Sequence, residues 1–192
     1  MIVLGFDTSA THCAAALYRD GEIVSSQLEE MKRGQAERLM GLLEEVLLES
    51  ALTWADLDRV GVGVGPGNFT GIRIGVSAAR GLALGLKIPA IGVNRFESLQ
   101  NSTAQTGIPC VLAPQDNVYV QRPNMPPELL SREAAEELEQ SLIFETTGFN
   151  SAIEVARIAA HRDLDNLQRP APLYIKSADA APARDAPPRI IP

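Results

Sequence analysis

The stretch Gly65-Pro66-Gly67-Asn68-Phe69-Thr70-Gly71-Ile72-Arg73, GPGNFTGIR, follows the apolar run VGVGV and leads into IGVSAARGLALGLK. The run before it predicts a strand, and the residues from Thr70 to about Leu86 predict a helix. Glycines between a strand and a helix are typical of a turn with positive φ, which Thr70 would complete as helix N-cap. They are equally typical of an anion site at a helix N-terminus. Either alternative puts a strand–turn–helix unit at the centre of an α/β fold.

The loop matches none of the common glycine motifs of catalysis. A Walker A loop needs a lysine beside its last glycine, and Ile72 follows Gly71 here. Gly65, Gly67 and Gly71 are spaced one residue too widely for the dinucleotide fingerprint G-x-G-x-x-G. The nearby GVSAA lacks the last glycine of a nucleophile elbow.

Composition indicates a globular protein that is a poor nucleic-acid binder by itself. The 192 residues are 45% hydrophobic and 21% charged, with a formal net charge of −7. Binding a phosphate backbone needs clustered lysine and arginine, which this balance disfavours. Cys13 and Cys110 lie in no CxxC pair and are expected to be small buried side chains. No basic leader precedes MIVLGFDTS and no apolar run reaches the length of a membrane span, so we expect a cytoplasmic protein without membrane contact.

Glycine and proline divide the chain into two regions. Residues 1–107 hold 14 of the 15 glycines but 2 of the 13 prolines. This shift predicts an N-terminal lobe at 1–107 and a second lobe at 108–176. Residues 177–192 are mostly alanine, proline and charge, and we expect them to be a disordered tail.

The first region has the pattern of a complete α/β unit. IVLGFDTS predicts a strand, and CAAALYRDGEIVSSQLEE predicts two more that turn at Asp20-Gly21. Leu39, Leu43, Val46 and Leu47 recur at helical spacing in QAERLMGLLEEVLLESA. PAIGV predicts a further short strand, and NRFESLQNSTAQ opens a helix with the capping-box pair Asn94 and Glu97.

The second region has a weaker pattern. CVLAPQDNVYVQRP predicts one or two strands, and Ser131 is positioned to cap a helix over REAAEELEQ. Ser151 and Glu154 form a capping-box pattern before AIEVARIAAHR. We therefore expect a reduced second lobe of one or two strands plus helices.

Asp7-Thr8-Ser9 is the candidate polar site of the first strand. Asp7 ends the strand, where its carboxylate either bonds nearby backbone N–H groups or faces a phosphate or magnesium ion. The two histidines, His12 and His161, lie in no zinc motif. His12 and Cys13 are neighbours on a predicted strand, so their side chains point to opposite faces and cannot form a dyad.

The helix after the glycine loop is more apolar than a helix on one sheet face requires. Gly71, Gly75, Ala78, Leu82 and Gly85 share one side of it, and Arg73, Ser77, Arg80 and Lys87 form its polar stripe. The small residues either pack inside their own domain or meet another chain together with the leucine-rich helix 35–50.

Three stretches carry a resemblance to a known family. LGFDTSATHCAAAL at the N-terminus and DLDRVGVGVGPGNFTGIRIGVSAARGLALGLKIPAIGV at 56–93 resemble the TsaB (YeaZ) family, bacterial partners of the tRNA threonylcarbamoyladenosine synthase subunit TsaD. APQDNVYVQ at 113–121 and PAPLYIKSADA at 170–180 resemble the start and the closing segment of its second domain. The chain departs from the family at Gly34-Gln35, where many members have a histidine, and in the short middle of its second lobe.

The resemblance implies an α/β fold of the actin-like ATPase, ribonuclease-H-like type, with a complete N-terminal lobe and a reduced second lobe. It implies a non-catalytic subunit with a degenerate nucleotide site at Asp7, Thr8 and Ser9. It further implies pairing with TsaD through helices 35–50 and 71–86, and self-association into a homodimer when the partner is missing. The interface residues it indicates are Leu39, Leu42, Leu43, Val46, Gly71, Arg73, Ile74, Gly75, Ala78 and Leu82.

In such an assembly a TsaE-type ATPase is the third subunit. The complex transfers a threonylcarbamoyl group to the adenosine next to the anticodon of ANN-decoding tRNAs. ATP and magnesium would act in the complex, this chain would need no cofactor or metal, and tRNA would be contacted only through the complex. The alternative from the residues themselves is a small nucleotide hydrolase or phosphotransferase that uses Asp7 and the loop 65–71. A peptidase activity has no supporting metal or nucleophile set.

Overall fold

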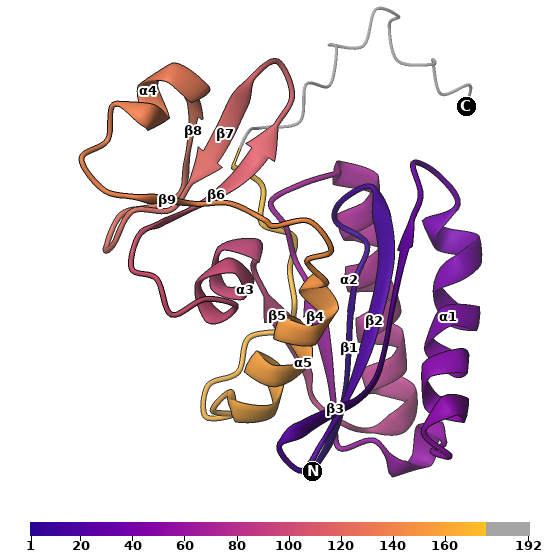
Figure 1. Ribbon diagram of the computed structural model, residues 1–192. Coiled ribbons are helices and arrows are strands. Elements are labelled where there is room, and N and C mark those ends of the chain that lie inside the picture. Colours follow the sequence, from indigo (N-terminus) through magenta and orange to yellow (C-terminus); the bar gives the residue numbers. More distant parts are fainter. Residues whose placement is uncertain (176–192) are drawn as a thin grey trace, which may run out of the picture.

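The computed structural model describes residues 1–175 (Figure 1). The predicted hairpin at Asp20-Gly21 joins two neighbouring strands at one edge of a five-stranded mixed sheet. The predicted tail at 177–192 lies outside the described residues. The strand order is β3-β2-β1-β4-β5, with β2 antiparallel to its neighbours and β4 and β5 parallel to β1. The strands of this first sheet are β1 (Ile2–Asp7), β2 (His12–Arg19), β3 (Glu22–Glu30), β4 (Arg59–Gly63) and β5 (Ala90–Val93).

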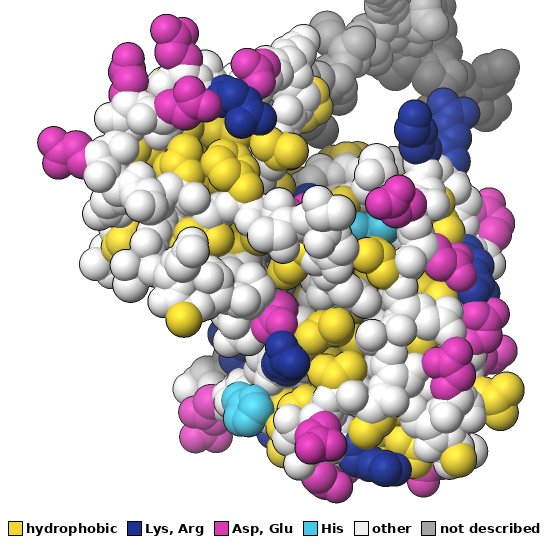
Figure 2. All heavy atoms as spheres, in the orientation of Figure 1, with side chains coloured by type: hydrophobic (Ala, Val, Ile, Leu, Met, Phe, Trp, Pro, Cys, Tyr) yellow, Lys and Arg dark blue, Asp and Glu magenta, His cyan; other side chains and the backbone are white. Residues whose placement is uncertain are grey.

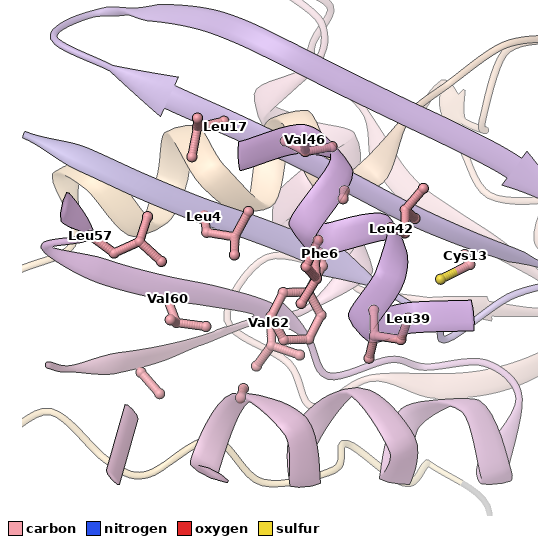
Figure 3. Close-up of a cluster of buried hydrophobic side chains, with 14 of the residues drawn as sticks. Leu4, Phe6, Cys13, Leu17, Leu39, Leu42, Val46, Leu57, Val60 and Val62 are labelled. Carbon is pink, nitrogen blue, oxygen red and sulfur yellow. The ribbon is translucent and has the colours of Figure 1, made fainter. Parts of the chain in front are cut away.

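Helices cover both faces of the first sheet, and each face buries an apolar core. The helices α1 (Gln35–Glu49) and α2 (Phe69–Leu86) lie on one face, and α5 (Ser151–His161) lies on the other (Figure 1). Alternate residues of β1 supply the two cores: Leu4 and Phe6 face α1 and α2, whereas Val3 faces α5. Figure 3 shows the first core, where the side chains of α1 interlock with those of β1, β2 and β4. Within residues 1–175 no helix combines the length and apolar character needed to cross a bilayer.

Two of the four predicted helix caps differ from the observed ones. The capping box of Asn94 and Glu97 is confirmed at α3 (Arg95–Asn101). Thr70 is not the N-cap of α2 (Phe69–Leu86), because it already lies inside the helix. The N-cap is Asn68, whose side chain accepts from the N–H of Gly71 at 2.9 Å. At α5 the N-cap is Asn150, and Ser151 is already helical. In both cases a nearby asparagine competes successfully for the capping position.

The second lobe contains more strand than the sequence predicted. Its sheet has four strands in the order β8-β7-β6-β9, so the expectation of one or two strands was wrong. They are β6 (Ile108–Ala113), β7 (Asn117–Val120), β8 (Glu128–Ser131) and β9 (Leu142–Ile143). Ser131 caps α4 (Arg132–Glu136), as predicted, but this helix is shorter than the expected one. The strands β8 and β9 have four and two residues, too few for a periodic pattern to reveal.

Helix α5 returns to the first lobe although it follows the second sheet in the chain. Its alanine-rich face packs on β1, β2 and β4, where Gly5 and Gly61 leave room for close approach. The guanidinium Nη1 of Arg59 donates to the carbonyls of Ala159 at 3.0 Å, Ala160 at 3.3 Å and Arg162 at 2.7 Å. Arg59 on β4 therefore caps the C-terminus of α5, whose last carbonyls lack helical partners.

We expect Arg59→Met to lower the free energy of unfolding by about 1–3 kcal/mol, because three carbonyls at a partly buried helix end lose a charged donor. Methionine keeps the apolar stem of the side chain. The measurement is urea denaturation followed by circular dichroism. Arg19→Met, at an exposed position on the hairpin, is the matched control and should change the midpoint little. Equal midpoints for the two variants would show that the cap contributes nothing.

Candidate functional site

The end of β1 lies directly against the start of α2. The Thr8 hydroxyl donates to the Gly71 carbonyl at 2.7 Å, and the Asn68 N–H donates to the Ser9 carbonyl at 2.6 Å. A Cβ placed on Gly67 would overlap the carbonyl of Ser9, and a Cβ on Gly71 would overlap that of Thr8. The two glycines are therefore required because two backbones meet, not because of their dihedral angles.

This contact bears on both interpretations of the glycine loop. Gly65 has a φ of 91°, as expected for a strand-to-helix turn. The N–H groups of Asn68 and Gly71, which an anion at the helix N-terminus would use, are bonded to protein oxygens instead. The turn is observed, with Asn68 in place of Thr70 as the cap, and anion binding at the helix N-terminus stays a prediction. The loop connects β4 to α2 along the chain and packs against the residues that follow β1.

Asp7 is the centre of a buried polar cluster. One carboxylate oxygen, Oδ1, accepts from the Ser9 N–H at 2.7 Å. The other, Oδ2, accepts from Ser151 Oγ at 2.6 Å and lies 3.4 Å from His12 Nε2. Burial raises the pKa of Asp7, but the hydrogen bond and charge of His12, the charge of Arg95 and the Ser151 hydroxyl together outweigh burial and hold that pKa well below its usual range. The predicted local role of Asp7, a bond to nearby backbone, is confirmed.

The cluster has the residue types of a serine hydrolase without its geometry. In a Ser–His–Asp triad the serine donates to histidine, and the aspartate holds the opposite ring nitrogen. Here Ser151 Oγ is directed to Asp7, and the same His12 nitrogen, Nε2, lies 3.4 Å from both. Ser151 is fully buried, so a substrate cannot reach its hydroxyl. Cys13 packs in the core on the opposite face of β2 from this cluster, which confirms that it forms no dyad with His12.

The three predicted nucleotide-site residues lie together but face inward. Asp7, Thr8 and Ser9 are all fully buried, and the polar side-chain atoms of the first two are bonded to protein groups. Ser9 Oγ is buried without a hydrogen-bond partner among the described residues. Nucleotide binding by these residues remains a prediction, and in this conformation the Asp7 carboxylate is occupied by internal donors.

An ion pair between the lobes lies beside the cluster. Arg95 at the start of α3 is buried, pairs with Glu145 of the second lobe, and approaches the Pro66 carbonyl at 3.4 Å. Its charge also favours the ionised form of Asp7. The sequence pointed to Asp7, but it did not show that Arg95 and Ser151 lie next to its carboxylate. The one clue was physical: a carboxylate at the end of an apolar strand needs donors from somewhere.

Six of the ten predicted interface residues lie inside the chain. Gly75 packs inward: a Cβ there would lie 2.9 Å from Thr8 Oγ1 and 3.3 Å from Val62 Cγ2. The burial of all six residues corrects the expectation that they form surplus apolar surface. These six, which fill the core between the first sheet and its two helices, are Leu39, Leu42, Leu43, Val46, Gly71 and Gly75.

The other four predicted residues border an outer face of α2 that residues 1–175 leave open. Arg73 is exposed, and Ile74, Ala78 and Leu82 are half-buried. Beside them are three residues that are not among those ten. Leu84 is 82% exposed, and a Cβ built on Gly81 or Gly85 meets no described atom within 4 Å.

Arg73 holds the C-terminal segment against α2. Its guanidinium carbon lies 3.9 Å from the ring centroid of Phe69, and its Nε donates to the Tyr174 hydroxyl at 2.9 Å. The rings of Phe69 and Tyr174 stack with centroids 4.9 Å apart. Farther along the helix, Arg80 Nε donates to the Pro170 carbonyl at 2.8 Å. The described C-terminal segment therefore runs along one side of α2, opposite the side next to α1.

Comparisons with known proteins place the chain in a family. Residues 21–139 match the family model described as TsaD: tRNA N6-adenosine threonylcarbamoyltransferase. The chain is 36% identical over 117 residues to the tRNA threonylcarbamoyladenosine biosynthesis protein TsaB of Escherichia coli, covering 60% of this chain and 50% of the relative. It is 33% identical over 99 residues to the TsaB protein of Bacillus subtilis, covering 52% and 43%. The chain spans about half the length of the curated relatives it matches.

Solved structures agree on the fold. YeaZ from Pseudomonas aeruginosa superposes with a TM-score of 0.72 at 22% sequence identity, covering 90% of this chain and 99% of that chain. The fold is the predicted α/β, actin-like and ribonuclease-H-like one, with two mixed sheets. From the family model, the relatives and the fold together, the chain belongs to the TsaD family and, within it, to the TsaB (YeaZ) group.

Proposed function

We propose that this chain is a non-catalytic subunit of the assembly that installs N6-threonylcarbamoyladenosine next to the anticodon of ANN-decoding tRNAs. It pairs with a TsaD-type catalytic subunit and serves that subunit as scaffold and activator. The similarity to proteins named for threonylcarbamoyladenosine biosynthesis supports this pathway. ATP and magnesium act in the complex with a TsaE-type ATPase, and tRNA reaches this chain through its partners.

The observation that carries the proposal is the outer face of α2. Leu84 is exposed over 82% of its surface, and the two glycines beside it, Gly81 and Gly85, leave the helix backbone accessible. Leaving a large apolar side chain in water forgoes about 1.5–3 kcal/mol of burial energy. A helix without side chains at 81 and 85 allows another helix to approach closely, because interaxial distance depends on the side chains at the contact. We infer that this face receives the catalytic subunit, or a second copy of the chain when that subunit is missing.

The polar cluster supports an accessory role rather than a catalytic one. The nucleotide hydrolase alternative requires the Asp7 carboxylate to face a phosphate or its metal ion. That carboxylate is buried and already accepts from Ser9 and Ser151. The polar cluster therefore supports the folded structure, and the chemistry belongs to the partner.

Gly81→Trp should abolish pairing while leaving the monomer folded. A side chain at 81 points into open space, so the melting temperature should stay close to that of the wild type, whereas an indole blocks the approach of a second helix. The measurement is co-elution of the chain with the TsaD-type subunit of its own genome on size exclusion. The matched control is Ser26→Trp, an exposed position on β3.

Wild type and Ser26→Trp should co-elute with the partner and Gly81→Trp should not. If the wild type fails to co-elute, the proposed function is wrong. Should Gly81→Trp co-elute as the wild type does, the pairing surface lies elsewhere.

A further inference from the structure

The outer face of α2 carries a stripe of positive charge with no negative charge among it. Arg73, Arg80 and Lys87 are spaced seven residues apart, two helical turns each time, so they lie on one side of the helix. The segment 69–87 contains no aspartate or glutamate. This is unusual in a chain whose formal net charge is −7. Figure 2 shows the opposite character elsewhere, with acidic side chains over α4 and along the edge of α1.

The stripe residues make no ion pair within residues 1–175, whereas half of the twelve arginines in that part of the chain do. Arg73 and Arg80 donate to neutral oxygens, the Tyr174 hydroxyl and the Pro170 carbonyl. Lys87 ends α2 at the surface. By contrast, six arginines pair with a carboxylate, namely Arg38, Arg95, Arg122, Arg132, Arg157 and Arg162. Within the described residues, the three cations of the α2 stripe therefore have no carboxylate paired with them.

Apolar features accompany this stripe. Leu84 lies between Arg80 and Lys87 along the helix and is largely exposed. A cavity of about 410 Å³ adjoins it, between the last turns of α2 and the segment 167–170, with Ala83, Ile88 and Pro89 in its lining. A partner that offers both carboxylates and an apolar side chain would match charge to charge and fill the cavity.

We propose that the outer face of α2 seats an acidic amphipathic helix of the TsaD-type subunit. Carboxylates of that helix lie opposite Arg73, Arg80 and Lys87, and one of its apolar side chains enters the cavity beside Leu84. Stripe residues seven apart are about 10.5 Å apart along the axis, a spacing that carboxylates repeating every seven residues on a second helix would match. This inference rests on the proposed function and names the chemistry that selects the partner.

The observations favour a protein over RNA as the occupant. A phosphate backbone would meet the positive stripe, but it offers no apolar side chain for Leu84, the glycines or the cavity. It would also meet a chain with a surplus of seven negative charges. An acidic helix satisfies both the charge and the apolar surface.

The test measures the dissociation constant between this chain and the TsaD-type subunit by calorimetry at 50 and 500 mM salt. Lys87→Glu is the test variant, because Lys87 is exposed at the helix end and makes no side-chain bond within the described residues. Arg19→Glu, exposed at the hairpin, changes the net charge equally and is the matched control. We expect Lys87→Glu to weaken binding about three- to thirtyfold at low salt. High salt should weaken wild-type binding and shrink the difference, since exposed charges are screened.

The outcomes separate this inference from the proposed function. If the wild type does not bind the TsaD-type subunit at 50 mM salt or at 500 mM salt, both the inference and the proposed function are refuted. Wild-type binding that is independent of salt, with Lys87→Glu equal to Arg19→Glu, refutes the acidic helix but keeps the pairing. The inference also fails if Lys87→Glu leaves partner binding intact and instead reduces binding of free tRNA or self-association of the chain.

Discussion

Gly71→Ala should strongly destabilise the fold. The added Cβ would overlap the Thr8 carbonyl oxygen, which belongs to the backbone directly after β1. Overpacking a well-packed site costs about 1–3 kcal/mol and more when the clash is with backbone that cannot move. We expect at least about 3 kcal/mol, a large share of the 5–15 kcal/mol that stabilises a typical domain.

Gly81→Ala is the control, because it makes the same substitution ten residues along the same helix. A Cβ at 81 meets no described atom within 4 Å, and alanine favours a helix over glycine by about 0.5–1 kcal/mol. Urea unfolding should therefore move in opposite directions for the two variants. If Gly71→Ala unfolds at the same urea concentration as Gly81→Ala, the close contact between β1 and α2 does not exist.

Asp7→Ala should cost about 3–5 kcal/mol of folding free energy, the range for breaking a buried charged network by removing one partner. The substitution leaves the Ser9 N–H, the Ser151 hydroxyl and His12 without their acceptor in a fully buried site. Asp7→Asn keeps the shape of the side chain but replaces one acceptor oxygen with a donor group. It should therefore destabilise less than Asp7→Ala and remain folded for comparison across pH.

The pH dependence of the Asp7 variants has a defined sign. The folded state lowers the pKa of Asp7, so the unfolded chain binds its proton first as the pH falls. The stabilisation is fully present above the unfolded pKa of about 3.9 and is lost as the pH falls below it toward the lowered folded pKa. Urea midpoints between pH 7 and pH 2 should fall more steeply for the wild type than for Asp7→Asn. Parallel curves would mean that the carboxylate of Asp7 is not held by charged partners.

Local patterns were sufficient to predict most of the first lobe. The Asp20-Gly21 hairpin, the leucine-rich helix and the Asn94 capping box are all set by residues close in sequence, and the structure confirms them. The assignment of faces on α2 was the main error. This helix is apolar around most of its circumference, so periodicity cannot tell which small residues face the sheet and which face solvent. The structure turns Gly71 and Gly75 inward and leaves Gly81 and Gly85 outside.

The remaining misses depend on contacts between residues far apart in the chain. Ser151 meets Asp7 across 144 positions, and Arg59 caps a helix 100 positions later. Neither pairing leaves a local sequence pattern. In the same way, Tyr174 joins the start of α2 only because the chain returns from the second lobe along that helix.

The most direct test of the account is tRNA modification by the TsaD-type subunit, supplied with its TsaE-type ATPase, ATP, magnesium and threonylcarbamoyl donor, with and without this chain. We predict that N6-threonylcarbamoyladenosine accumulates only when the chain is present, and that Gly81→Trp removes the stimulation while Ser26→Trp preserves it. Modification at the same rate without the chain, or modification by the chain in the absence of the TsaD-type subunit, would contradict the claim that it is a non-catalytic activating partner.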